Sequence, residues 1–314
     1  MSRAFTFPGQ GSQFVGMGKE LAENLATARH VFEEVDEALG QKLSKLMFEG
    51  PEADLTLTEN AQPALMAVSL AVTRTLERDF GVRIADKAAF VAGHSLGEYS
   101  ALAAAAAISL ADTARLLKRR GRAMQRAVPV GKGAMAALLG LDLETAKAVA
   151  AEAAQGEVCA TANDNAPGQV VVSGDKAAVE RAIEIAKGKG ARRSIQLPVS
   201  APFHCPLMQP AADDMAEALA AVTIKSPVAP LVANVTAAAE RDPERIRKLL
   251  VEQVTGLVRW RESVLYMTDQ GVETVIELGA GKVLTGLAKR IKDGLQGIAI
   301  GSPQDMEEFV KSLA

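Results

Sequence analysis

The sequence predicts an α/β protein with a large domain built on a parallel β-sheet and a small subdomain inserted into it. Strand-like apolar runs alternate with amphipathic helical segments over most of the chain, as in parallel sheets covered by helices on both faces. Between residues 133 and 197 the order changes to β-α-β-β-α-β, the ferredoxin-like pattern. A chain of 314 residues is long enough for both parts. We expect residues 1–130 and 199–314 to form the large subdomain and residues 131–198 the insert.

The elements before residue 130 follow from local sequence. Ala4–Phe7 is an apolar strand that ends at the turn-forming segment Pro8–Gln13. A long helix begins near residue 60, with Asn60 as its expected N-cap and apolar side chains at helical spacing as far as Phe80. Gly81 is expected to end this helix. The remaining elements of this part are a buried strand at 88–92, a helix at 98–107 and a helix from Ser109 to about Val128.

The predicted insert contains four strands and two helices. Its turn-rich segment Asn163–Gly168 is expected to connect two strands of a hairpin. Asp142 and Asp175 are the expected starting residues of the two helices. The strands are predicted at 134–139, 158–162, 169–173 and 191–197, and the helices at 142–154 and 175–187.

After Pro198 the sequence returns to the alternation that is typical of a parallel sheet. Asp242-Pro243 and Ser302-Pro303 each combine a capping residue with a proline, as at the first turn of a helix. The predicted helices begin near residues 206, 242, 260, 281 and 302, and the predicted strands lie at 231–235, 272–278 and 298–300.

Composition and charge exclude several classes of function. A net charge of −3 and a pI near 5.8 argue against general binding to nucleic acid or to an anionic membrane surface. The longest apolar stretch, residues 101–108, is too short to span a membrane. Cys159 and Cys205 are too few for a disulfide framework, which favours a reducing cytoplasm. We therefore expect a cytoplasmic protein.

The most informative motif is Gly93-His94-Ser95-Leu96-Gly97, between the predicted strand at 88–92 and the predicted helix at 98–107. In this strand–turn–helix setting, G-x-S-x-G forms a nucleophile elbow, so the large domain is predicted to be α/β-hydrolase-like. The glycines allow a tight turn that exposes the serine hydroxyl, and a backbone N–H at the start of the helix points at any oxyanion formed there. We expect Ser95 to carry an acyl group.

A serine hydroxyl needs an adjacent base to act as a nucleophile near neutral pH. His30 lies in an amphipathic stretch and is expected at the surface. His94 adjoins Ser95, but neighbouring side chains diverge at a sharp turn, so His94 is expected to support the elbow. His204, at the end of the loop 199–204, is therefore the expected base. No acidic residue near it stands out, so a carboxylate and a backbone carbonyl both remain open as the group that orients its imidazole.

Two further features have alternative interpretations. The Pro8–Gln13 loop lacks the third glycine of a dinucleotide fingerprint, so it is either a structural turn or a source of backbone N–H groups for an anion. Residues 113–141 and 185–212 contain basic but no acidic side chains. Such runs are commonly solvated helix faces. Here they border the insert and predict a positive cleft for a phosphorylated or acidic partner, and one arginine of 113–122 is expected to clamp a carboxylate.

Several short motifs occur in order along nearly the whole chain. They are F-P-G-Q-G-S-Q at 7–13, T-E-N-A-Q-P-A-L at 58–65, G-H-S-L-G-E-Y-S-A-L at 93–102, R-G-R-A-M-Q at 120–125, N-D-N-A-P-G-Q at 163–169, the loop ending at His204, and V-E-Q at 251–253. This series resembles the malonyl-CoA:acyl carrier protein transacylases of bacterial type II fatty acid synthesis.

The resemblance implies roles for the matching residues. Ser95 would be the nucleophile and His204 its base, oriented by the backbone C=O of Gln253. The backbone N–H groups of Gln10 and Leu96 would form the oxyanion hole. The implied substrate-binding residues are Arg120, which pairs with the malonyl carboxylate, Gln62, Asn165, Gln169, and Phe203, which crowds an α-methyl branch.

The activity implied by the resemblance is a ping-pong transfer of malonyl from coenzyme A to the phosphopantetheine thiol of acyl carrier protein, through a malonyl-serine. The expected partners are the coenzyme A thioester and acyl carrier protein, with no cofactor and no metal, and the chain is expected to be a monomer.

Three other functions compete with this one. A serine esterase or thioesterase would share the elbow but has no need of a buried Arg120. A transferase with another acyl preference, such as methylmalonyl, or a malonate-decarboxylase partner would share the whole motif series. A non-catalytic scaffold for carrier protein would not need Ser95 and His204.

Overall fold

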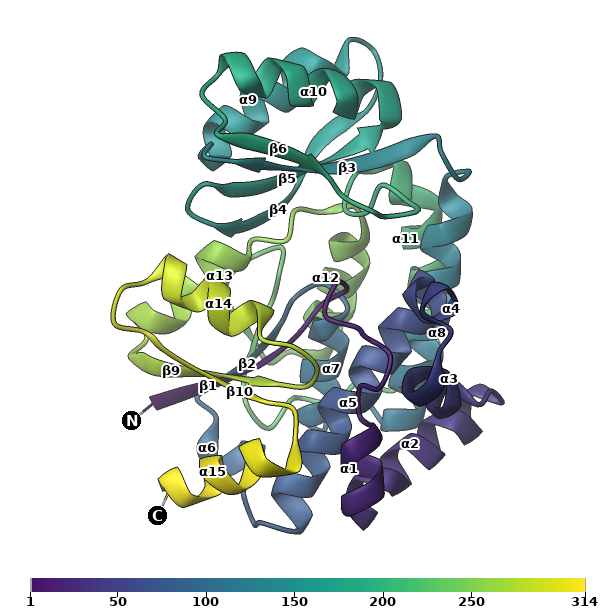
Figure 1. The fold of residues 1–314 in the computed structure, drawn as a ribbon, viewed down its shortest axis with the longest axis vertical. Helices are drawn as coiled ribbons and strands as arrows, with labels where there is room; N and C mark the ends of the chain where they lie inside the picture. Colours follow the sequence, from purple (N-terminus) through teal and green to yellow (C-terminus); the bar gives the residue numbers. More distant parts are fainter. Residues whose placement is uncertain (1, 314) are drawn as a thin grey trace.

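The structure is a computed structural model that describes residues 2–313. It is a mixed α/β structure with two sheets, the smaller above the larger in Figure 1. The larger sheet has the order β10-β9-β1-β2-β7-β8, in which β8 pairs antiparallel at one edge and the other pairs are parallel. The smaller sheet, β4-β5-β3-β6, is antiparallel. The strands are β1 (Ser2–Phe7), β2 (Phe90–Gly93), β3 (Gly133–Leu139), β4 (Cys159–Ala166), β5 (Gln169–Asp175), β6 (Arg193–Gln196), β7 (Leu231–Val232), β8 (Ala239–Glu240), β9 (Val272–Leu278) and β10 (Gln296–Ile300).

Helices occupy most of the remaining chain (Figure 1). The long helices α5 and α8 pack against each other and against α2. The helices are α1 (Lys19–Asn24), α2 (Ala26–Leu39), α3 (Leu43–Glu49), α4 (Glu52–Thr56), α5 (Thr58–Arg78), α6 (Ile84–Lys87), α7 (Gly97–Ala104), α8 (Leu110–Ala127), α9 (Leu143–Ala154), α10 (Lys176–Gly188), the 3₁₀ turn η1 (Pro206–Met208), α11 (Gln209–Ala220), α12 (Pro243–Thr255), α13 (Trp260–Asp269), α14 (Val283–Ile291) and α15 (Pro303–Leu313).

The large sheet is buried on both faces. Along β1, Phe5 and Phe7 belong to a core shared with α5 and α7, whereas Ala4 belongs to a second core shared with α13 and α14. This alternation follows from the two-residue period of a strand. The predicted parallel sheet with helices on both faces is therefore confirmed, and the parallel register brings the carboxyl ends of β1, β2 and β7 to one edge.

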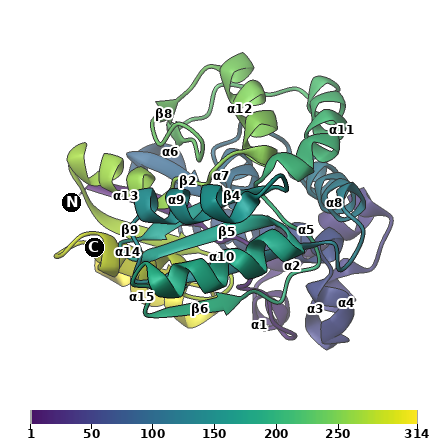
Figure 2. The same cartoon turned by 90° about the horizontal axis from the view of Figure 1, so that it is seen from above.

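The small sheet is built from consecutive elements in the predicted order, β3-α9-β4-β5-α10-β6. Helices α9 and α10 lie side by side over its outer face (Figures 1 and 2). Ala136 and Leu138 of β3 form a separate core with these helices. Met135 and Ala137, which alternate with them, point to the opposite face and join the main core. The small sheet thus packs onto the rest of the protein through one face.

Three predicted boundaries of local structure differ from the structure. Asn60 is not an N-cap: α5 begins at Thr58, and the buried Asn60 amide accepts a hydrogen bond from Lys118 Nζ at 2.8 Å. The helix also ends at Arg78, before Phe80. The predicted connection at 163–168 does join two antiparallel strands, but the turn is shorter than expected: β4 continues to Ala166, and only Pro167 and Gly168 lie between β4 and β5.

Other boundaries agree with the predictions to within a few residues. Ser109, Asp142 and Asp242 are N-caps whose side chains accept backbone N–H groups, as expected. Asp175 precedes α10 but accepts the N–H of Val158 instead. The sequence analysis missed the short elements α1, α3, α4, α6 and β8, since four to seven residues, or two, show no usable periodicity.

Candidate active site

Three loops at the carboxyl ends of adjacent strands form the floor of the site. Gln10 follows β1, Ser95 follows β2, and Asn234 follows β7. Binding sites in parallel α/β sheets commonly lie at this edge. Helix α8 adds Arg120, and the loop before η1 adds His204.

The turn that carries Ser95 is tight and strained. Ser95 has φ of 54°, a left-handed conformation that residues with side chains rarely adopt. A Cβ atom at Gly93 would lie 1.9 Å from the carbonyl carbon of Gly97, so no larger residue fits there. The Ser95 N–H donates to Asn234 Oδ1 at 2.8 Å, and Asn234 Nδ2 donates to the Gly93 carbonyl at 2.7 Å. Asn234 therefore holds the turn in the geometry that the elbow motif predicts.

The serine hydroxyl is hydrogen-bonded to a buried histidine. His204 Nε2 lies 2.7 Å from Ser95 Oγ, and His204 Nδ1 lies 2.8 Å from the backbone oxygen of Gln253. Because a carbonyl oxygen only accepts, Nδ1 carries the proton and Nε2 presents its lone pair to the hydroxyl. Burial, together with the nearby charge of Arg120, lowers the pKa of His204 to about 3. The imidazole is therefore neutral and able to accept a proton at physiological pH.

Two backbone donors beside the hydroxyl are free. Within residues 2–313, the N–H groups of Gln10 and Leu96 donate to no protein acceptor. Leu96 is the N-cap of α7, so its N–H lies at the positive end of that helix. The Gln10 side chain is held by Thr58, whose Oγ1 donates to Gln10 Oε1 at 2.8 Å. Such a pair of donors is suited to a developing oxyanion.

Arg120 brings a buried positive charge next to the Ser95 hydroxyl. The residue is 1% exposed, and its Nη2 lies 3.2 Å from Ser95 Oγ. The neighbouring Gly121 permits this placement, because a Cβ there would lie 2.5 Å from the Cα of Glu59, and α8 could not approach the start of α5.

The contacts of Arg120 are all with uncharged groups. Its Nη1 donates to Gln62 Oε1 and its Nη2 to Gln253 Oε1, each at 2.8 Å, and its Cζ lies 5.7 Å from the centre of the Tyr99 ring. Burial lowers the pKa of the guanidinium. In residues 2–313, no carboxylate forms an ion pair with Arg120. The cation is therefore available to an anionic ligand.

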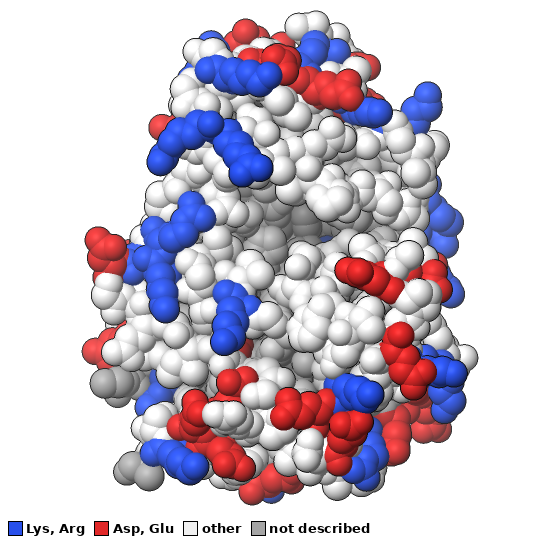
Figure 3. Space-filling view, in the orientation of Figure 1, with Lys and Arg blue, Asp and Glu red and all other residues white. Residues whose placement is uncertain are grey.

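These groups line a single cavity of about 430 Å³. The surface is hollowed between the small and the large sheet (Figure 3). The polar part of the cavity lining includes Ser95, His204, Arg120 and Gln62. Its apolar part includes Met124, Met135, Leu197, Val199 and Phe203.

Comparisons with known proteins place the chain in a family. The acyl transferase domain family model matches residues 4–302. The malonyl CoA-acyl carrier protein transacylase of Bacillus subtilis (strain 168) is 47% identical over 311 residues, which cover 99% of this chain and 96% of that protein. The chain belongs to the malonyl CoA-acyl carrier protein transacylases.

Solved structures agree with this assignment. The crystal structure of acyl-carrier-protein-S-malonyltransferase from Bartonella henselae is 56% identical with a TM-score of 0.97, covering 100% of this chain and 99% of that one. A malonyl-transacylase solved in complex with its type II PKS acyl-carrier protein is 42% identical with a TM-score of 0.96, covering 99% of this chain and 100% of that one.

The remaining residues that the family resemblance implied lie at different distances from the cavity. Gln62 and Phe203 line it. Asn165 supports the elbow from β4, since His94 Nε2 donates to its Oδ1 at 2.8 Å, while His94 also lies against Trp260. Gln169 does not line the cavity; it lies at the start of β5, and its side chain accepts a hydrogen bond from Arg290. His30 is exposed, as expected.

Sequence reasoning missed two polar residues of this transacylase site. Asn234 holds the elbow, and the buried Glu98 accepts hydrogen bonds from Gln253 Nε2 at 2.5 Å and from the Asn234 N–H at 3.4 Å. Burial raises the pKa of Glu98 to about 7. The signal for Glu98 was its position directly after the elbow, in a segment that is otherwise uncharged.

The predicted positive cleft is largely wrong for α8, because acidic residues from other helices pair with its cations. Arg119 and Arg126 contact Asp214 of α11 at 2.5 and 2.8 Å. Lys118 and Arg122 contact Glu59 of α5 at 3.0 and 2.8 Å. An acid-free run of sequence therefore did not produce an acid-free surface.

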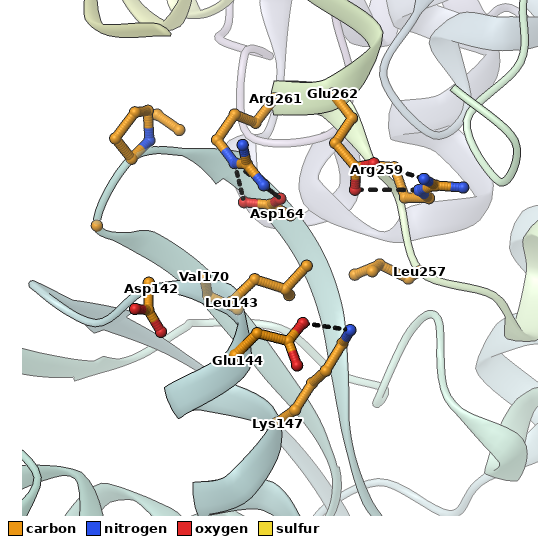
Figure 4. A pocket seen from close by; sticks show the side chains of 13 residues that line it. Asp142, Leu143, Glu144, Lys147, Asp164, Val170, Leu257, Arg259, Arg261 and Glu262 are labelled. Carbon is orange, nitrogen blue, oxygen red and sulfur yellow. Dashed lines mark hydrogen bonds and ion pairs between the residues drawn. The ribbon is translucent and has the colours of Figure 1, made fainter. Parts of the chain in front are cut away.

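A second cleft, of about 750 Å³, lies between the small sheet and α13 (Figure 4). Apart from Asp142, which caps α9, its charged side chains are paired: Arg261 with Asp164, Arg259 with Glu262, and Lys147 with Glu144. In the described residues, no group of histidine, cysteine and acidic side chains could hold a metal ion. No helix of residues 2–313 is long and apolar enough to cross a membrane.

Proposed function

We propose that the chain transfers a malonyl group from coenzyme A to the phosphopantetheine thiol of acyl carrier protein, through a malonyl-serine at Ser95. The observation that carries the proposal is the buried Arg120 guanidinium, which lies 3.2 Å from the Ser95 hydroxyl and forms no ion pair with a carboxylate of residues 2–313. An enzyme for uncharged acyl groups gains nothing from such a cation, whereas a malonyl carboxylate would pair with it. The names of the relatives support the same reaction.

In the first half-reaction, His204 Nε2 takes the proton of Ser95 as Oγ attacks the thioester carbon. The negative charge on the carbonyl oxygen is accepted by the N–H groups of Gln10 and Leu96. When the intermediate collapses, the carbon–sulfur bond breaks and the coenzyme A sulfur takes the proton from His204. The product is malonyl-Ser95, with its free carboxylate on Arg120.

In the second half-reaction, the thiol of the carrier protein arm gives its proton to His204 Nε2 and attacks the malonyl-serine carbon. The same oxyanion donors act again, and Ser95 leaves with the proton from His204. A thioester is thus exchanged for a thioester. Water competes with the incoming thiol for the malonyl-serine, and the apolar side chains of Met124, Met135 and Phe203 are proposed to limit this hydrolysis. Phe203 is also proposed to crowd acyl groups that carry an α-branch.

Acyl carrier protein is the proposed protein partner, and a related malonyl-transacylase has been solved in complex with one. Basic side chains gather along one side of the hollow in Figure 3. Arg192, Arg193 and Lys289 are exposed and have no ion-pair partner within residues 2–313. They would attract the phosphate of the arm or an acidic surface. We infer a cytoplasmic monomer that needs no cofactor or metal, and the free thiols of Cys159 and Cys205 support the compartment.

We also infer that the chain consists of two subdomains. We assign residues 131–198 to a ferredoxin-like subdomain, supported by the element order β3-α9-β4-β5-α10-β6 and the separate core under α9 and α10. Residues 1–130 and 199–314 then form an α/β-hydrolase-like subdomain, supported by the elbow at the end of β2.

The proposed function is tested by intact mass spectrometry of the protein mixed with malonyl-CoA. We expect one malonyl adduct, which disappears when holo acyl carrier protein is added and does not form in Ser95→Ala. An adduct that water removes as fast as carrier protein does would indicate a thioesterase, and an adduct that persists in Ser95→Ala would contradict the assigned nucleophile.

A further inference from the structure

The side chain of Gln253 connects three parts of the active site. Its Oε1 accepts a hydrogen bond from Arg120 Nη2 at 2.8 Å. Its Nε2 donates to the backbone oxygen of Ser95 at 2.8 Å and to Glu98 Oε2 at 2.5 Å. Its backbone oxygen is the acceptor of the His204 imidazole. Gln253 is itself fully buried, so its bonds to Arg120, Ser95 and Glu98 all depend on the orientation of one side-chain amide.

Glu98 helps to set that orientation. The backbone oxygen of Ser95 only accepts hydrogen bonds and the Arg120 guanidinium only donates them, and an ionised Glu98 adds a second, charged acceptor for the NH₂ group of the amide. The reversed amide would place an oxygen against the carboxylate and an NH₂ group against the guanidinium, and both contacts would be repulsive inside a buried site. Glu98 is 1% exposed and does not form an ion pair with Arg120 among the described residues.

We propose that Glu98 is a positioning residue for acyl-group selectivity: through the Gln253 amide, it holds Arg120 on neutral acceptors and leaves the guanidinium charge for the substrate carboxylate. This inference rests on the proposed function. In this arrangement the Glu98 carboxylate contacts the Gln253 amide, and that amide separates the carboxylate from the Arg120 guanidinium. A carboxylate in direct contact with Arg120 would compete with malonyl for the same donors.

The first test is the malonyl-to-acetyl selectivity of Glu98→Gln, taken as the ratio of kcat/KM for malonyl-CoA to kcat/KM for acetyl-CoA. An amide at position 98 is uncharged and can donate as well as accept, so it holds the Gln253 amide less firmly than a carboxylate, and we expect the ratio to fall ~10-fold, with the larger change in KM for malonyl-CoA. Because both substrates are measured on one preparation, the ratio does not depend on the fraction of folded protein. An unchanged ratio, even with lower activity, would overturn the proposal.

The second test exchanges the two side chains in the double variant E98Q/Q253E. The exchange keeps an amide–carboxylate pair but brings the carboxylate into contact with Arg120. If a carboxylate in contact with Arg120 does not affect acyl selectivity, the ratio stays at the value of Glu98→Gln, and that result would overturn the proposal. If our proposal is correct, the ratio falls further than in Glu98→Gln, by ~100-fold relative to wild type.

The matched control is Glu277→Gln. Glu277 is also fully buried and accepts backbone N–H groups, those of Leu284 and Thr285, but it does not line the active-site cavity. The Glu277→Gln substitution should lower thermal stability without changing the malonyl-to-acetyl selectivity ratio. A fall in that ratio equal to the one in Glu98→Gln would contradict the proposal. Failure of the wild-type protein to form malonyl-serine would instead refute the proposed function, which separates the two results.

Discussion

Two arginines near the junction of the sheets have opposite electrostatic surroundings. Arg120 in the active-site cavity contacts two amide oxygens, a hydroxyl and an aromatic ring. Arg261, in the neighbouring cleft, contacts both oxygens of Asp164, with Nη2 2.8 Å from Oδ2 (Figure 4). The carboxylate satisfies Arg261 and ties β4 to α13. The neutral acceptors orient Arg120 without cancelling its charge. The difference indicates which cation is suited to bind a ligand and which is structural.

The largest expected effect comes from removing the unpaired cation. We predict that Arg120→Ala lowers kcat/KM for malonyl-CoA by about 10²–10³-fold, the value typical of losing a buried charged contact, while acetyl transfer survives or rises. Steady-state assays with both thioesters measure this. Equal losses for the two acyl groups would show that Arg120 is structural, like Arg261.

The converse substitution removes the paired cation. Arg261→Ala should lower the free energy of unfolding by about 2–3 kcal/mol, because it leaves the buried Asp164 carboxyl without its partner. The selectivity between malonyl and acetyl should not change. Denaturant unfolding and the selectivity assay together test this prediction.

The loss of stability in Arg261→Ala should also depend on pH. Burial already raises the pKa of Asp164 and Arg261 opposes this shift, so without Arg261 the pKa in the folded state rises further. A raised carboxyl pKa favours folding at low pH and costs stability as pH increases through it. The destabilisation should therefore be smaller at pH 5 than at pH 8, and the opposite trend would contradict the role of the pair.

A smaller effect is expected on the pH dependence of acylation. Wild-type acetylation of Ser95 should stay flat from pH 8 to about 5.5, since the pKa of His204 is about 3 and the base stays neutral. Burial is the main cause and Arg120 the second, so in Arg120→Ala the acid limb should move to higher pH. Single-turnover rates at several pH values provide the measurement. Identical pH profiles for wild type and Arg120→Ala would show that Arg120 does not lower the pKa of His204.

The smallest effect is expected at the surface of α8. Arg119 pairs with Asp214 at 2.5 Å, but the Arg119 side chain is 44% exposed. Arg119→Ala should therefore change the free energy of unfolding by less than about 1 kcal/mol and leave KM for carrier protein unchanged. A marked rise in the KM for carrier protein would instead support the predicted binding of carrier protein to the basic residues of α8.

Some features of the site were predictable because their cause is local. The glycines of the elbow are required by the turn itself, and the capping residues Ser109, Asp142 and Asp242 act within four residues of their own position. His204 was found by elimination among three histidines. By contrast, the predicted cap at Asn60 is wrong and the predicted turn at 163–168 starts four residues too early, since distant residues supply partners of these segments.

The sequence alone determined the order of strands and helices, the serine turn and the pool of candidate side chains, because backbone sterics and hydrophobic periodicity act over a few residues. Only the tertiary structure decided which charges are neutralised. Arg119 and Arg120 are neighbours in the chain, yet one faces acidic residues of α11 and the other faces amides brought from positions 62 and 253. Coulomb interactions and hydrogen bonds depend on distances in space, and those distances are set by how the helices pack.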